Sequence, residues 1–315
     1  MTVRDAEADS AILPGMPGKR SVRNAMKPRV AIVGAGNLAS ALAVALHGAG
    51  YGIDQIISRD QAASFRRARR LAGQVGASAV AAARAQIRAD IVWFCVPDGA
   101  IAGAAEALKA AADWSGKVAV HSSGALTSDE LADLQRRGAA VASVHPFMTF
   151  VRGSRPRLVG VPFAIEGDAV AVRMARRIVK NLHGCAYSIR NEDKAAYHAW
   201  GTFASPLLTA LLVTSEHVAA AAGVKVKAAR QRMLPILKQT LANYVAFDAA
   251  GAFSGPIIRG DVDTVKRHLR TLRGVPVAEG VYVSLARAAL AYLPGKNKET
   301  IETALKSLRR SRSRN

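Results

Sequence analysis

The sequence predicts an α/β domain built on a parallel sheet, followed by an all-helical domain. Between residues 29 and 189, short apolar stretches of strand length alternate with longer stretches at helical spacing, which is typical of a parallel sheet with crossover helices. Beyond Asn191 the strand pattern ends, and long Ala/Leu/Val-rich stretches at helical spacing continue. A chain of 315 residues suits two domains better than one.

The elements of the first domain are expected in regular alternation. The expected strands cover residues 29–33, 52–58, 77–80, 91–96, 118–121, 141–144, 158–165 and 185–189. Helices are expected at 37–48, 61–72, 101–112 and 128–137, with one more after Asp168. The fourth strand is apolar throughout and is bounded by Asp90 and Pro97, as expected for a strand covered on both faces. The helices of the second domain are expected to run to residue 222 and then at 226–246, 262–272 and 277–293.

Composition at the two ends sets the domain limits. Residues 1–27 mix Pro, Gly, Ser and charge without a period, so we expect a disordered leader. The sheet domain is then expected at 28–190 and the helical domain at 191–295, with a basic helix and tail at 296–315. The pattern contains no repeat of solenoid length.

Cysteine content and apolar patterning indicate the compartment. The two cysteines, Cys95 and Cys185, form neither a disulfide framework nor a metal-ligand cluster, which indicates a reducing environment. Charged residues or turn signals interrupt every long apolar stretch, so we expect no membrane-spanning helix and no membrane partner. The sequence therefore predicts a cytoplasmic protein without a bound metal.

The chain is strongly basic, with a formal net charge of +21. Much of this charge lies in the run 66–70 and in the tail after residue 296, and we interpret both as solvated charge. No basic run is interleaved with stacking aromatics, which make up only 5% of the chain, and this argues against a nucleic-acid partner. The charge instead indicates a general attraction for anionic ligands such as a phosphorylated dinucleotide.

A glycine-rich motif directly follows the first expected strand. It reads Gly34-Ala35-Gly36-Asn37-Leu38-Ala39, a G-x-G-x-x-A fingerprint placed between a strand and a helix. The first glycine allows a tight turn, and the second lets a pyrophosphate approach the backbone. The amides of the helix start then face the anion. The motif predicts a Rossmann-type dinucleotide-binding domain.

The residues at the end of the second strand indicate which dinucleotide the domain binds. A carboxylate at this point usually holds the ribose 2′-hydroxyl of NAD. Here Ser58 and Arg59 offer a hydroxyl and a guanidinium, which suit the 2′-phosphate of NADP. Asp60 follows directly and either takes the NAD role or caps the next helix. The sequence favours NADP, with NAD possible.

Two segments carry candidate chemical residues. Lys194, His198, Thr202 and Ser205 are spaced by four, four and three, so they share one helix face. We interpret Lys194 as a proton donor to a substrate carbonyl, with His198 tuning or assisting it; the alternative is a satisfied surface stripe. The second segment, His121-Ser122-Ser123-Gly124, lies at the carboxyl end of a strand, where ligands of open α/β sheets bind. Its alternative role is a loop that caps the next helix.

Together these motifs resemble predicted bacterial Rossmann-type oxidoreductases whose helical second half carries a domain-of-unknown-function label. The resemblance covers residues 27–293 and rests also on Val96-Pro97-Asp98, His145-Pro146, Tyr197-His198 and the run 255–261. More distantly, the layout is similar to pyrroline-5-carboxylate reductase, ketopantoate reductase, the deazaflavin-linked NADP reductases and the β-hydroxyacid dehydrogenases. The resemblance implies a helical domain like that of 6-phosphogluconate dehydrogenase and a homodimer formed through it.

The resemblance also implies individual site residues. Val96 and Pro97 join Gly34, Ala35, Gly36, Asn37, Leu38, Ser58 and Arg59 as cofactor contacts. The resemblance implies Ser122 or Ser123 with Gly124, and Lys194 with His198, as the substrate site. From this, together with strand position and helix spacing, we expect substrate contacts at His121, Ser122, Gly124, Thr202 and Ser205, and catalytic roles for Ser123, Lys194 and His198. The chain departs from the pattern at Pro206, where Asn is expected. Because proline removes an amide and kinks a helix, this departure puts any amide-mediated substrate contact there in doubt.

The expected function is an NADP-dependent oxidoreductase acting on a small carbonyl or imine substrate, with a 2-oxo acid favoured as in ketopantoate reductase. A 3-hydroxyacid dehydrogenase is the nearest enzymatic alternative. A non-catalytic dinucleotide-binding regulator and a basic scaffold that binds nucleic acid are the alternatives from other classes, because a fold alone does not decide a function.

Overall fold

The computed structural model describes residues 27–154 and 156–306, which divide into two compact units. The chain passes from the first unit to the second between Lys194 and Ala195, four residues beyond the limit of 190 expected from the sequence. Each unit is described by itself. The expected leader, apart from Lys27, and the last nine residues of the expected tail lie outside the described residues.

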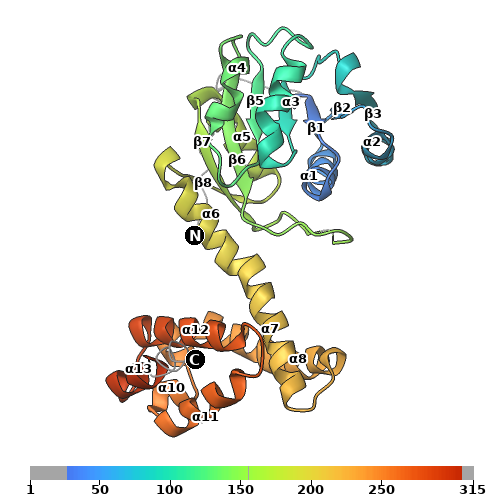
Figure 1. The fold of residues 1–315 in the computed structure, drawn as a ribbon. Coiled ribbons are helices and arrows are strands. Elements are labelled where there is room, and N and C mark those ends of the chain that lie inside the picture. The colour runs from blue at the N-terminus through green and yellow to red at the C-terminus, as the bar shows by residue number, and fades with distance from the viewer. Residues whose placement is uncertain (1–26, 155, 307–315) are drawn as a thin grey trace, which may run out of the picture. The chain divides into compact units, whose positions relative to one another are not determined.

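The first unit is built on one eight-stranded sheet (Figure 1). Its strand order is β3-β2-β1-β4-β5-β6-β7-β8. The chain moves outward from β1 to β3 and then returns to β4 on the other side of β1. The strand order therefore reverses between β1 and β4. At such a reversal a crevice forms at the carboxyl ends of the strands. The bounds are β1 Val30–Val33, β2 Ile53–Ser58, β3 Ser78–Ala81, β4 Ile91–Phe94, β5 Val118–His121, β6 Ala140–Pro146, β7 Pro162–Gly167 and β8 Cys185–Ser188.

The strands β1 to β6 pair in parallel, as predicted, but β7 pairs with β6 in the antiparallel direction. The sheet is mostly parallel, as predicted, and the pairing of β6 with β7 is its antiparallel exception. The physical reason lies in the connection, because a parallel return needs a long crossover, usually a helix. The described residues between β6 and β7 contain no helix. The antiparallel pairing aligns Ser143 with Glu166.

Helices cover both faces of the sheet, as in a doubly wound fold. α1 (Asn37–Gly48), α2 (Ala62–Val75) and α5 (Ala169–Asn181) pack into one buried cluster, and α3 (Ile101–Leu108) and the short α4 (Ala132–Gln135) pack into the other. The neighbouring residues Trp93 and Phe94 on β4 are fully buried in opposite clusters. This explains the unbroken apolar pattern of β4, because alternate side chains of a strand point to opposite faces.

The second unit is helical, as predicted. Within the described residues its helices are α6 Lys194–Thr202, α7 Leu208–Ala221, α8 Val226–Ala246, α9 Ala249–Ala252, α10 Pro256–Arg259, α11 Val262–Leu272, α12 Ala278–Tyr292 and α13 Lys298–Lys306. The predicted bounds of α8 and α11 are confirmed. Glu216 on α7 is buried and accepts two hydrogen bonds from Arg230 on α8. This paired contact fixes the α7–α8 hairpin, because a fork-shaped guanidinium matches both carboxylate oxygens.

Pro206 is accommodated by a change in helix type. Residues Phe203–Leu207 form a π-helical turn between α6 and α7, and Pro206 lies inside it. Such turns occur where the regular i→i−4 ladder is interrupted. The continuous helix Asn191–Ala221 is, by length and composition alone, the one helix among the described residues that could cross a membrane. The absence of a membrane span therefore stays a prediction.

Candidate functional site

A cleft of about 1550 Å3 opens in the first unit at the carboxyl ends of β1, β2 and β4. Its walls include the glycine-rich loop, α1, α2 and the connection between β6 and β7. Among its described lining residues no side chain is acidic. Six arginines line it: Arg59, Arg66, Arg67, Arg70, Arg152 and Arg157. Because the strand order reverses here, this is the place where doubly wound sheets bind nucleotides.

Gly34 makes the tight turn that ends β1. Its φ is +110°, and a Cβ at this position would lie 2.4 Å from the carbonyl oxygen of Cys95. A side chain here would therefore clash with the backbone of Cys95, just after β4, and would also strain the turn. Gly36 has no neighbour within 4 Å of a Cβ position, so its missing side chain leaves open space. Gly34 thus makes the tight turn, Gly36 leaves open space before the helix, and their contact with a pyrophosphate stays a prediction.

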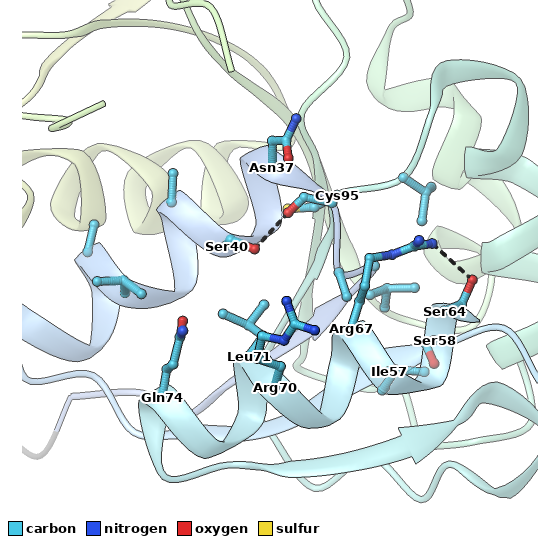
Figure 2. A pocket seen from close by; sticks show the side chains of 18 of the residues that line it. Asn37, Ser40, Ile57, Ser58, Ser64, Arg67, Arg70, Leu71, Gln74 and Cys95 are labelled. Carbon is cyan, nitrogen blue, oxygen red and sulfur yellow. Dashed lines mark hydrogen bonds between the residues drawn. The ribbon is translucent and has the colours of Figure 1, made fainter. Parts of the chain in front are cut away.

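The start of α1 faces the cleft with free backbone amides. Gly36 is the residue before the helix, and its carbonyl accepts bonds from the Ser40 amide and hydroxyl, at 3.0 Å and 2.9 Å (Figure 2). The first amides of a helix have no partner inside it, and the helix dipole makes this end attractive to anions. Asn37 lines the cleft, and its amide group donates to the Phe150 carbonyl at 3.2 Å. Leu38 packs instead against the core, so only its backbone is available to a ligand.

The far end of the cleft carries the residues expected to select the cofactor. Ser58 and Arg59 both line the cleft, whereas Asp60 does not. Ser64 and Arg67 on α2 lie beside them, and Arg67 donates to the Ser64 hydroxyl at 3.3 Å (Figure 2). Ser64 was not predicted, and Arg67 was interpreted, with the rest of the run 66–70, only as solvated charge, although Arg66, Arg67 and Arg70 line the cleft. The sequence did contain a signal for this pair, because Ser64 and Arg67 lie one helical turn apart in the first turns of the helix after β2.

Near the β4 end the cleft approaches the His121-Ser122-Ser123-Gly124 segment. Val96 and Pro97 line the cleft together with Cys95. The Cys95 thiol is buried, which raises its pKa to about 12, and a hydrogen bond with Ser122 partly opposes this shift. The Ser122 hydroxyl also accepts a hydrogen bond from the Trp93 indole at 2.8 Å. Through Ser122, the segment therefore contacts Cys95, which lines the cleft.

His121 holds the segment together from inside. The Ser123 amide donates to its Nδ1 at 3.1 Å, and its Nε2 lies 2.9 Å from the Thr127 carbonyl. An acceptor role for Nδ1 requires the hydrogen on Nε2, which then donates to Thr127. Burial lowers the pKa of His121 to about 4, with Lys194 adding to this shift and the Thr127 bond and Asp98 opposing it. His121 is therefore neutral near pH 7.

Lys194 is buried within the first unit, with 1% of its surface exposed. Its Nζ lies 2.6 Å from Ser143 Oγ, 3.3 Å from the Ser123 carbonyl and 3.6 Å from Glu166 Oε1. Burial lowers the pKa of Lys194, and Glu166 opposes this shift. Lys194 is not among the residues that line the cleft. The structure thus brings Lys194 together with Ser123 but places its ammonium inside a polar network.

The other three members of the expected helix stripe differ from Lys194. His198 is exposed, and Thr202 and Ser205 are half-buried. The Thr202 hydroxyl donates to the His198 carbonyl at 3.0 Å. Ser205 lies within the π-helical turn, where its carbonyl accepts from the Thr209 hydroxyl. The four residues share a helix, but they do not form the uniformly solvent-exposed face that their spacing predicted.

Sequence reasoning missed Ser128, Ser143 and Glu166. Glu166 is the only acidic residue in β7 and is 6% exposed. Its Oε1 accepts from the Ser128 amide and its Oε2 from the Ser128 hydroxyl, both at 2.8 Å. An acidic residue inside an apolar strand was the available signal, since buried carboxylates require partners.

Comparison with known families supports the division into two kinds of domain. Residues 15–146 match the family described as a Rossmann-like domain, and residues 161–289 match the family described as domain of unknown function DUF2520. The chain joins a Rossmann-like domain to a DUF2520 domain. The second match begins just before β7 and so includes the antiparallel edge of the sheet as well as the helices. A search of curated proteins found no match.

Solved structures share this fold. A candidate NADP oxidoreductase from Bacteroides fragilis has a TM-score of 0.71 at 23% identity, covering 84% of this chain and 98% of its own. An imine reductase from a Pseudomonas species has a TM-score of 0.56 at 23% identity, covering 89% and 99%. A pyrroline-5-carboxylate reductase from Coxiella burnetii has a TM-score of 0.54 at 14% identity, covering 90% and 98%. At these identities the likeness establishes the fold.

Proposed function

We propose that this Rossmann–DUF2520 protein is an NADP-dependent oxidoreductase that reduces a small imine or carbonyl compound. The observation that carries this proposal is the cleft at the strand reversal, which combines a glycine-rich turn, a free helix start and six arginines. Pyrophosphate and phosphate groups fit such a surface, because amides, the helix dipole and guanidinium groups all favour negative charge.

The proposed cofactor is NADPH, with NADH as a weaker ligand. The glycine-rich turn and the start of α1 would hold the pyrophosphate. Ser58, Arg59 and Arg67 would hold the 2′-phosphate, because they line one end of the cleft while the carboxylate of Asp60 does not. Val96 and Pro97 would lie against the nicotinamide end. When bound, the dinucleotide supplies the hydride.

The proposed substrate binds beside the His121–Gly124 segment, with the Ser122 hydroxyl as a contact. Ser122 Oγ accepts from Trp93 and also bonds with the Cys95 thiol, so a substrate carboxylate or carbonyl oxygen would take the Ser122 hydrogen in place of Cys95. Fold relatives named as imine reductases, a reductive aminase and a pyrroline-5-carboxylate reductase act on carbon–nitrogen bonds. We therefore place cyclic imines first among substrates and 2-oxo acids second.

The test is a turnover screen that follows NADPH absorbance. Purified protein is supplied with NADPH and with cyclic imines or 2-oxo acids, and the loss of absorbance is measured against matched reactions with NADH. Turnover of either class with a preference for NADPH supports the proposal. Tight NADPH binding without turnover of any substrate would favour a dinucleotide-binding regulator. A salt-sensitive shift of labelled DNA or RNA would instead favour a scaffold.

We also propose that the protein acts in the cytoplasm as a homodimer formed through the second unit. The helix α8 exposes large apolar side chains, among them Leu234, Leu241, Tyr244 and Val245. Leu234, Leu241 and Val245 are seven and four residues apart and so share one face. An exposed apolar stripe of this kind is typical of an interaction surface, and a second copy of the same stripe would cover it.

A further inference from the structure

A buried ion pair connects the first residue of α6 to the sheet of the first unit. Lys194 and Glu166 are 1% and 6% exposed, and their charged atoms are 3.6 Å apart. Burying two charges is costly, and a protein retains such a pair only where further hydrogen bonds satisfy both groups. Both groups here have such bonds. Their partners are Ser123 and Ser128 in the segment 123–128, and Ser143 on the strand β6.

The pair holds both ends of the segment 123–128. At one end, Lys194 reaches the Ser123 carbonyl at 3.3 Å, and Ser143 Oγ donates to the same carbonyl at 3.0 Å. At the other end, both oxygens of Glu166 accept hydrogen bonds from Ser128. Between them, the Ser123 hydroxyl accepts from the amides of residues 125 and 126, at 3.1 Å and 2.9 Å. The segment is therefore closed by its own bonds and anchored at both ends by the ion pair.

The ammonium of Lys194 donates two hydrogen bonds to the protein and has Glu166 as its ion-pair partner. A lysine carries three donors and no acceptor, and three oxygens lie around Nζ, from Ser143, Ser123 and Glu166. A general acid must come within about 2.6–3.2 Å of the atom that it protonates. Lys194 does not line the cleft, and neither do residues 121–124; what distinguishes Lys194 is that its ammonium is already bonded to Ser143 and to the Ser123 carbonyl.

We propose that Lys194 and Glu166 act together as a positioning pair that fixes the His121–Ser128 segment as the wall of the substrate site. The roles follow from the chain positions: Glu166 on β7 anchors residue 128, and Lys194 anchors residue 123. Lys194 then serves the reaction through Ser122 and its neighbours and transfers no proton itself. This inference rests on the proposed function only where it names the segment as a substrate wall.

The test compares Lys194→Met, Glu166→Gln and the double variant. Either single change leaves an unpaired charge in the network, whereas the double change removes both charges and leaves groups of similar size. Hydrogen exchange of the segment 121–128 is measured with NADPH affinity, kcat and the pH profile of kcat. Asp193→Asn, which breaks an exposed ion pair with Arg190 next to Lys194, is the matched control.

A positioning pair predicts faster exchange in residues 121–128 in each single variant and unchanged NADPH affinity. It also predicts that kcat falls in each single variant while the pH profile of kcat keeps its shape, and that the double variant, which weakens the anchors at both ends of the segment, is no more active than the single variants. If Lys194 is the proton donor, Lys194→Met changes the basic limb of the pH profile of kcat whereas Glu166→Gln at equally fast exchange keeps it, which overturns the proposal. Unchanged exchange in Lys194→Met overturns it as well.

Ser128→Ala keeps the test decisive if a single charge variant does not fold. This change removes a hydroxyl bond to Glu166 and does not touch Lys194, so positioning predicts faster local exchange and a kcat lowered by about 3- to 10-fold. A wild-type kcat with unchanged exchange would count against the pair. Because exchange needs no substrate, it still decides the positioning proposal if the turnover screen fails and the proposed function falls.

Discussion

The Arg67 guanidinium donates a hydrogen bond to the Ser64 hydroxyl, one turn earlier on α2, at 3.3 Å (Figure 2). Ser64 is buried, and both residues line the cleft beside Ser58 and Arg59. The contact restrains an otherwise mobile side chain before any ligand arrives. A restrained guanidinium loses less conformational entropy on binding an anion, so this end of the cleft is prepared for a phosphate.

Replacing Arg59 tests the choice of cofactor. We expect Arg59→Ala to weaken NADPH binding about 10- to 100-fold and to leave NADH nearly unchanged, because a hydrogen bond to a charged group is worth about 1.5–3 kcal/mol. Arg67→Ala should act in the same direction. Dissociation constants for both cofactors, measured by titration, provide the comparison, and Asp60→Ala is the control. Equal weakening of NADPH and NADH would show that Arg59 does not read the 2′-phosphate.

Two glycine variants separate folding from ligand binding. Gly34→Ala places a Cβ at φ +110° and 2.4 Å from the Cys95 carbonyl oxygen, so we expect a lower melting temperature and a loss of NADPH binding. Gly36→Ala has open space around the new methyl group. It should keep the wild-type melting temperature and lose NADPH affinity, because the methyl group fills the approach of the pyrophosphate. Wild-type affinity in Gly36→Ala would move the phosphate site elsewhere.

His121 makes the stability of the first unit sensitive to acid. Its folded pKa of about 4 lies below the ordinary value of 6.5, so the unfolded chain binds the extra proton first. Its contribution is therefore complete above pH 6.5 and is lost as the pH falls towards 4, by up to about 3 kcal/mol. Denaturant unfolding across this range measures the slope. His121→Gln, which cannot titrate, should show a shallower slope, and an equal slope would contradict this account.

A single charge on α8 tests the proposed dimer. We expect Val245→Glu to convert a dimer into a monomer in light-scattering measurements, because it places a carboxylate in an apolar contact. Arg270→Glu on the exposed face of α11 is the control and should not change the mass. A wild-type protein that is monomeric at all concentrations, or a Val245→Glu variant that stays dimeric, would exclude this stripe as the interface.

Local sequence signals predicted most of the fold. Helices such as α1 and α8 matched their expected bounds, since apolar spacing and turn residues define them locally. The strand β3 was found one residue from its expected position. The direction of β7 was not predicted, because it depends on the missing crossover between β6 and β7 and not on the composition of β7 itself.

The cleft was more predictable than the polar network. The cleft depends on a contiguous motif at Gly34–Asn37 and on the residues just after β2. Short stretches of sequence therefore contain the residues that define its chemistry. The network depends on Ser143 and Glu166, which become neighbours only through the antiparallel pairing of β6 and β7. Lys194 was singled out by its helix spacing, but spacing along a helix cannot tell whether a side chain enters a core or a solvent-filled site.

The arginine-lined cleft also bears on the direction of catalysis. Oxidation of the nicotinamide ring adds one positive charge, so NADP⁺ carries one unit less negative charge than NADPH. Among the described lining residues there are six arginines and no carboxylate, which favours the more negative form, and the preference grows as salt is lowered. A protein that holds the reduced cofactor more tightly than the oxidised one releases the spent form readily. The charge of the cleft therefore agrees with the reductive direction of the proposed function.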